Sequence, residues 1–238
     1  MEAVAVHDTR ELRERAPVFA DRMDGGVALA ALLRTLSLEE PVILAIPAGG
    51  VPVAVALARE TGWPLDVAVV SKITLPWNRE AGYGALAFDG SVRLDHDRVA
   101  LFELDEATVQ AGIAETRIKV ERRSRRLRGE RPIEVAGRSA VLVDDGLASG
   151  VTMECAIEAV RRLGPARVIA AAPTAHRDAA RRVDALADEV VCPNLRAELP
   201  YAVADAYERW QDVPEVVADE LLRPHREEGG PWASRGPA

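Results

Sequence analysis

Two adjacent acidic residues, Asp144 and Asp145, are followed within a few positions by glycines and small hydroxyl residues, a combination that can bind a phosphorylated sugar. The apolar run 140–143 before them is typical of a buried parallel strand. After them, the small turn 146–150 leads into a helical pattern that Thr152 opens. Backbone N–H groups at such a turn, and at the start of a helix, can bind an anion. The two carboxylates cannot favour a phosphate, so we expect them to face sugar hydroxyls or a Mg²⁺ ion.

This stretch resembles the phosphoribosyl-pyrophosphate (PRPP) signature of type I phosphoribosyltransferases, which has four apolar residues, two acids and a small-residue loop ending in Gly-x-Thr. The resemblance implies that Asp144 and Asp145 bind the ribose hydroxyls of PRPP and, through PRPP, a Mg²⁺ cofactor. It also implies that the 5′-phosphate is bound by Gly146, Ala148, Ser149, Gly150, Val151 and Thr152. An ordinary Asp-Asp-Gly surface turn is the alternative interpretation of the same residues.

A second small-residue loop, 46–52, follows the first apolar run and contains two adjacent glycines, which let a backbone approach a ligand closely. By the same resemblance, this loop would bind pyrophosphate through the main chain of Ala48, Gly49 and Gly50. The related prokaryotic branch typically has Pro-Arg-Gly-Gly here, whereas this chain has alanine in place of the arginine. Arginine would supply bidentate, charge-assisted bonds, so we expect weaker pyrophosphate binding unless Lys72 or Arg79 substitutes.

Lys72 follows the apolar run 65–70, at the edge where an open α/β sheet binds ligands. With Asp144 and Asp145 it would form the catalytic group. The region 73–104 resembles the mobile hood that closes over PRPP in this family and excludes water from the reacting carbon. We predict a polar loop over 71–84, a hairpin over 84–94 and a strand over 99–104.

These motifs leave open which molecule accepts the ribose 5-phosphate group. The resemblance implies transfer of ribose 5-phosphate from PRPP to a nitrogen acceptor, such as a nucleobase, with release of pyrophosphate. This is a pentosyltransferase (glycosyltransferase) reaction of nucleotide metabolism. Purine-salvage members carry an acid three positions after the second acid, where this chain has Ala148, so we expect hypoxanthine and guanine to be poor substrates. Because Ala48 replaces the arginine, a PRPP- or nucleotide-binding regulator with little catalysis is the alternative.

Composition limits the classes to which the chain can belong. Its 238 residues are 48% hydrophobic but only 4% aromatic, which favours aliphatic strands covered by helices on both faces. The net charge of −8 argues against nucleic acid as a partner and against attraction to anionic membranes. We see no membrane-length apolar run and no signal-peptide pattern, and therefore expect a cytoplasmic protein. Cys155 and Cys192 fit neither a zinc site nor a disulfide framework.

A basic run, 113–131, stands out against this acidic composition. It could bind RNA, as the pyrimidine-operon regulators of this superfamily do. Acidic residues among the cations instead favour a solvated helix or a subunit contact, so a homodimer is one alternative. The aromatic residues of the tail could stack on a base or close the edge of the sheet; they are Tyr201, Tyr207 and Trp210.

The order of the elements predicts an α/β fold with a mostly parallel, doubly wound sheet of the type I phosphoribosyltransferase kind. The strands are expected at the apolar runs 42–46, 65–70, 140–143, 168–172 and 189–192. We predict one domain, 18–222, whose hood combines residues 73–104 with the tail 193–222. Residues 1–17 would be a loosely held arm and residues 223–238 a flexible tail.

Overall fold

A computed structural model describes residues 6–129 and 131–226, apart from the side chains of residues 79 and 80. Its core is a six-stranded sheet in the order β1-β10-β8-β7-β2-β3, with every neighbouring pair parallel. The strands are β1 (Val6–His7), β2 (Val42–Ala45), β3 (Leu65–Val67), β7 (Ser139–Val143), β8 (Arg167–Ala171) and β10 (Glu189–Val191). The prediction of a mostly parallel sheet is confirmed.

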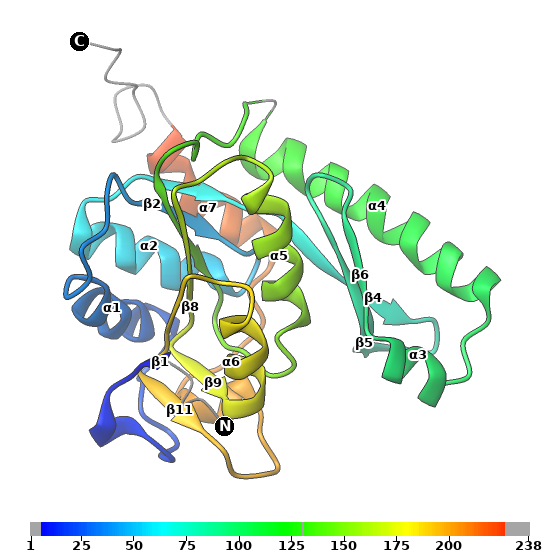
Figure 1. The fold of residues 1–238 in the computed structure, drawn as a ribbon, viewed down its shortest axis with the longest axis horizontal. Coiled ribbons are helices and arrows are strands. Elements are labelled where there is room, and N and C mark those ends of the chain that lie inside the picture. Colours follow the sequence, from blue (N-terminus) through cyan, green and yellow to red (C-terminus); the bar gives the residue numbers. More distant parts are fainter. Residues whose placement is uncertain (1–5, 130, 227–238) are drawn as a thin grey trace.

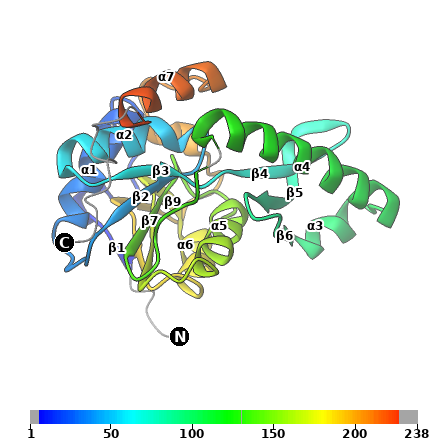
Figure 2. The same ribbon diagram turned by 90° about the horizontal axis from the view of Figure 1, so that it is seen from above.

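Helices cover both faces of this sheet (Figure 2), because its central strands are apolar on both sides. Ile43 and Val141 pack towards one face, and Leu44 and Leu142 towards the other, as the two-residue period of a strand requires. The first face carries α1 (Arg22–Leu33), α2 (Gly50–Thr61) and α7 (Glu215–Arg226). The second carries α5 (Val151–Arg161) and α6 (Arg177–Asp184). None of the helices in the described part of the chain has the length and apolarity needed to cross a bilayer.

The hood projects from one side of this core (Figure 1). Its antiparallel sheet consists of β4 (Val70–Leu75), β5 (Asn78–Ala87) and β6 (Val92–Leu94), and its helices are α3 (His96–Leu101) and α4 (Glu106–Arg128). The chain leaves the core sheet after β3 and enters the hood at β4, so the strand predicted over 65–70 is divided between two sheets.

Two predictions inside the hood are wrong. The polar loop expected over 71–84 is mostly strand, since buried Ile73 and Leu75 alternate with Lys72 and Thr74 in the pattern of a half-buried strand. The strand expected over 99–104 is instead the end of α3, as far as Leu101, followed by a turn. The side chain of Asp95 accepts a hydrogen bond from the Arg98 amide at 3.1 Å and caps that helix.

The ends of the described chain attach to the core. Val6 and His7 pair with β10, so at least this part of the expected loose arm belongs to the sheet. Short helical turns follow at Arg10–Leu12 and Val203–Ala206. Residues 193–222, which we expected to complete the hood, add no strand to its sheet. They form β11 (Asn194–Arg196), which pairs with β9 (Thr174–His176), and continue into α7. Of the expected flexible tail, residues 227–238 lie outside the described residues.

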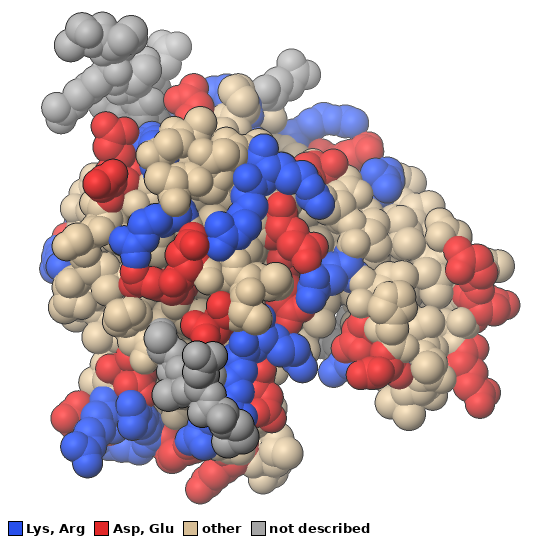
Figure 3. Space-filling view, in the orientation of Figure 1, with Lys and Arg blue, Asp and Glu red and all other residues tan. Residues whose placement is uncertain are grey.

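Three arginines of the basic run in α4 connect the hood to the core. Arg128 donates two hydrogen bonds, 2.7 and 2.8 Å long, to the carboxylate of Asp66 in β3. Buried Arg123 pairs at 3.3 Å with Glu215, the first residue of α7. Arg126 pairs at 3.6 Å with Asp219, also in α7. The expectation of a solvated face is wrong for Arg123 and Arg128, whose side chains are only 10% and 9% exposed, whereas Arg126 is exposed. Elsewhere, basic and acidic side chains are interspersed over the face in Figure 3.

Candidate ligand-binding site

The two predicted loops meet because β2 and β7 are parallel neighbours whose carboxyl ends lie at the same edge of the sheet. The contact leaves no space for side chains on the glycines. A Cβ atom on Gly49 would lie 2.1 Å from Oδ2 of Asp145, and one on Gly50 would lie 2.5 Å from the carbonyl oxygen of Val143. The peptide bond between Pro47 and Ala48 is cis. The fold thus brings the small-residue loop against the acidic pair.

The turn after the acidic pair is fixed at one point and open beyond it. Leu147 donates to the Thr174 carbonyl at 3.0 Å and accepts from the His176 amide at 2.9 Å, which ties the turn to β9. Gly150, with a φ of 81°, then directs the chain into α5. Within the described residues, the amides of Ala148, Ser149 and Gly150 donate no hydrogen bond. The first turn of α5 adds further amides without intrahelical acceptors, so this segment can bind an anion.

Asp145 is held by an arginine that sequence reasoning missed. Arg22, at the start of α1, donates from Nε to Oδ2 of Asp145 at 2.8 Å and from Nη1 to the Gln211 carbonyl at 2.8 Å. Its guanidinium also stacks on the Trp210 ring, 3.7 Å from the ring centroid. Tyr207 donates its hydroxyl proton to the Asp145 carbonyl at 2.6 Å. Asp145 therefore connects β7 to α1 and the C-terminal segment.

Asp144 has a different environment. It is partly buried, and its Oδ1 atom accepts a hydrogen bond from the Asp145 amide at 2.9 Å. Burial, followed by the negative charge of Asp145, raises the pKa of Asp144 above its ordinary value, and the charges of Lys72 and Arg22 offset only part of this. A cation or a cluster of hydroxyl donors beside Asp144 would stabilise its ionised form. Asp144 is thus the member of the pair that is available to a ligand.

A cleft of about 600 Å³ opens between the hood and the core, beside the turn. Its lining includes five of the predicted site residues, namely Lys72, Ala148, Ser149, Val151 and Thr152. The hood contributes Asp95, Asp97, Arg98 and Leu101, and the core contributes His176, Asp178, Arg182 and Tyr201, among others. The arrangement offers an anion-binding turn at one wall and a mixed polar wall opposite.

Comparison with known proteins agrees with this geometry. The family profile described as the phosphoribosyl transferase domain matches residues 23–207, which include both loops, the acidic pair and the hood. The chain belongs to the phosphoribosyl transferase family.

Two proteins are similar in sequence to this chain over most of its length. A Mycobacterium tuberculosis protein, provisionally named a phosphoribosyl transferase and found in two strains, is 40% identical over 213 residues. That match covers 88% of this chain but 48% of the relative, so the chain spans about half the length of the curated relatives it matches. A crystal structure from Thermus thermophilus is 37% identical with a TM-score of 0.68, and the match covers 86% of this chain and 97% of that one.

Not all of the predicted site residues line the cleft. Asp144, Asp145 and Gly146 lie where β7 runs into the turn, and the Ala48 loop packs behind them through Gly49. Arg79 is in β5, and its side chain lies outside the described part of the structure.

The aromatic residues of the tail have separate positions. Tyr207 packs against Phe19 at a centroid distance of 5.7 Å and against Trp210 at 5.4 Å, which closes the edge of the core. Tyr201 lines the cleft, with its ring 5.6 Å from that of His176. Only Tyr201 of the tail aromatics named above is therefore placed to contact a ligand in the cleft.

The side chains near the turn limit how the expected Mg²⁺ ion could be bound. Within the described residues, no group of three or more His, Cys, Asp or Glu side chains is arranged to hold a metal. This fits an ion that takes most of its ligands from phosphates and water and only one or two from the protein, as Mg²⁺ commonly does. Asp144 fits that role, whereas Oδ2 of Asp145 is engaged by Arg22.

Proposed function

We propose that this protein binds PRPP with Mg²⁺ and transfers its ribose 5-phosphate to a nitrogen acceptor, releasing pyrophosphate. The observation that carries the proposal is the turn 146–150, whose free amides follow an acidic pair at the end of a central strand and face a cleft. Phosphate on the turn and ribose beside the acids would place the reacting carbon near the cleft. The nitrogen acceptor would then approach from the side of the hood.

The residues have distinct roles in this proposal. Ala148, Ser149, Gly150, Val151 and Thr152 hold the 5′-phosphate through amides and hydroxyls. Asp144 accepts hydrogen bonds from ribose hydroxyls, and its negative charge also stabilises the positive charge that develops on the ribose ring in the transition state. Asp145 acts mainly by fixing the edge of the site through Arg22.

Lys72 and the Ala48 loop would bind the pyrophosphate group. Lys72 is exposed at the cleft and can stabilise the negative charge of the leaving group, as could Arg79. Mg²⁺ supplies the same stabilisation when it is bound with PRPP. The hood would close over the cleft and exclude water, so that the acceptor rather than water reaches the ribose.

Calorimetric titration of PRPP, with and without Mg²⁺, tests the binding step. We expect Mg²⁺-dependent binding that Asp144→Asn weakens at least tenfold, because it removes the charge that faces the ribose. Asp212→Asn is the matched control, since Asp212 is exposed and outside the cleft lining. Absence of PRPP binding by the folded wild-type protein would refute the proposal.

A PRPP- or nucleotide-binding regulator is the second candidate, and two observations favour it. The pyrophosphate loop has Ala48 in place of a cation, and Arg22 already neutralises Asp145. A panel of nucleobases distinguishes the candidates through release of pyrophosphate from PRPP. Base-dependent release supports the transferase, with hypoxanthine and guanine expected to be poor because Ala148 supplies no carboxylate. PRPP binding without release for any nitrogen acceptor supports the regulator.

A further inference from the structure

A buried carboxylate lies directly behind the proposed phosphate-binding turn. Glu154, in the first turn of α5, has a side chain that is only 4% exposed. Its Oε1 atom reaches back towards the turn, where it would lie 3.5 Å from a Cβ atom placed on Gly150. A negative charge at this position stabilises the N-terminus of the helix but opposes a phosphate bound on the same amides. The charge of Glu154 must therefore be compensated before the turn can bind an anion well.

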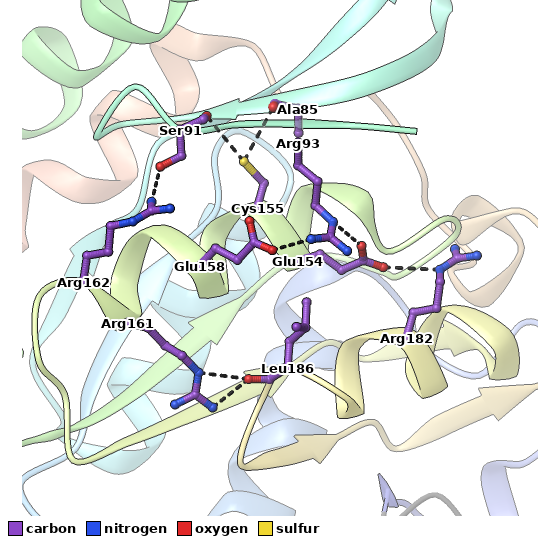
Figure 4. Close-up of polar contacts among 10 residues, drawn as sticks. All are labelled: Ala85, Ser91, Arg93, Glu154, Cys155, Glu158, Arg161, Arg162, Arg182 and Leu186. Atoms are coloured by element: carbon purple, nitrogen blue, oxygen red, sulfur yellow. Dashed lines mark hydrogen bonds and ion pairs between the residues drawn. The ribbon is translucent and has the colours of Figure 1, made fainter. Parts of the chain in front are cut away.

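Two arginines from distant elements supply that compensation (Figure 4). Arg93 of β6 pairs through Nε with Oε2 of Glu154 at 2.6 Å, and also contacts Glu158. Arg182 of α6 pairs through Nε with Oε1 at 3.3 Å. Each carboxylate oxygen thus has its own cation, one from the hood and one from the core. Because Glu154 is buried, it fixes the positions of both guanidinium groups.

Arg182 extends from this anchor to the turn itself. Its Nη2 group donates to the Ser149 carbonyl, and its Nη1 group has no acceptor among the described residues. The side chain is 54% exposed and lines the cleft together with Ser149 and Thr152. A guanidinium presents five N–H donors in one plane, so those not used by Glu154 and Ser149 remain available to a second anion at the same place.

We propose that Arg182 is a phosphate-binding residue of the turn 148–152 and that Glu154 is the positioning residue that holds it there. This inference rests on the proposed function, because it takes the 5′-phosphate of PRPP as the ligand of the turn. Arg182 supplies a charged N–H donor, which the turn's own amides lack. Through Glu154 and Arg93, the same contact connects the phosphate subsite to the hood strand β6.

Two half-ligands, each carrying one part of PRPP, distinguish the loss of the Arg182 contact from a general loss of structure. Ribose 5-phosphate carries only the phosphate that the turn would bind, and pyrophosphate with Mg²⁺ carries only the groups of the opposite subsite. We expect Arg182→Gln to weaken binding of ribose 5-phosphate and of PRPP about ten- to a hundredfold, the range for loss of a charged hydrogen bond. Binding of pyrophosphate should change less than about threefold, because it does not contact Arg182.

Arg181→Gln is the matched control, because it makes the same change in charge one position earlier on α6. Arg181 is 48% exposed, pairs with Asp178 at 3.6 Å and is not in the cleft lining. Equal effects of the two variants on ribose 5-phosphate would overturn the proposal, since only the shared change in net charge would then matter. Equal weakening of both half-ligands by Arg182→Gln would also overturn it.

Arg182→Lys keeps the inference testable if the glutamine variant does not fold, as judged by circular dichroism. Lysine retains the charge but not the fork that contacts Glu154 and Ser149 together, so intermediate affinity for ribose 5-phosphate is expected. Wild-type affinity for this ligand in the lysine variant would show that orientation by Glu154 has no role. If both Arg182 variants bound PRPP as tightly as the wild-type protein does, the inference would fail and the proposed function would stand.

Discussion

Removing Arg22 tests whether Asp145 is a structural anchor rather than a ligand contact. The ion pair is short, at 2.8 Å, and its side chains are only 9% and 16% exposed. Loss of one partner of a buried pair typically costs about 3–5 kcal/mol, since the other charge is left uncompensated. Asp145 keeps some contact with solvent, so we expect Arg22→Met to lower the free energy of unfolding by about 3 kcal/mol.

A double-mutant cycle separates the ion pair from the other contacts of Arg22. Asp145→Asn alone should cost less, about 1.5 kcal/mol, because the amide oxygen can still accept from Arg22. In the double variant no charge remains unpaired, and the total cost should therefore be about 2 kcal/mol smaller than the sum of the single costs. Urea unfolding of the four proteins at pH 7, followed by far-ultraviolet circular dichroism, provides these free energies.

The control is an ion pair of the same length at the surface. Arg209 and Asp21 are 2.7 Å apart, but their side chains are 65% and 36% exposed. Arg209→Met should therefore cost less than about 1 kcal/mol. Additive costs in the Arg22–Asp145 cycle, or a loss with Arg22→Met no larger than that with Arg209→Met, would refute the structural role of the buried pair.

Three further predictions concern the same region. The raised pKa of Asp144 means that the folded protein holds a proton that the unfolded chain releases above about pH 4, so stability should fall as the pH rises towards 8. Asp144→Asn should reduce this fall in urea titrations between pH 5 and 9, and an unchanged slope would contradict it. Gly49→Ala should cost about 1–3 kcal/mol, because the added methyl group meets Asp145; wild-type stability would contradict the close contact. Burial raises the pKa of the Cys155 thiol to about 12, so Ellman's reagent at pH 8 should react with it only after unfolding.

Sequence periodicity was sufficient for the core but not for the hood. A buried parallel strand is a continuous apolar run, and such runs predicted the central strands β2, β7 and β8. The hood strand β4 contains Lys72 and Thr74 on its open side, which gave it the composition of a polar loop. The short helix α3 depends on the Asp95 cap, a local hydrogen bond that outweighs the β-strand preference of the apolar residues after it.

Residues that act through long-range pairs could not be found by spacing. Arg22 lies 123 positions from Asp145, and Arg182 lies 28 positions from Glu154. Neither belongs to a local motif, because folding rather than sequence proximity brings the charges together. The one available signal was an arginine at the start of a helix rich in glycine and alanine, where α1 packs closely on α2. That pattern indicates close helix packing and gives no partner for the charge.

The different roles of the two acids follow from a property that the sequence did contain. Successive residues of a strand point to opposite faces, and Val141 and Val143 pack on the α1–α2 face while Ala140 and Leu142 pack on the α5 face. Continuing this alternation directs Asp145 towards α1 and α2, where Arg22 and Gly49 contact it. Asp144 falls on the side of α5 and its turn. Because Oδ2 of Asp145 is already engaged by Arg22, Asp145→Asn should retain more PRPP affinity than Asp144→Asn.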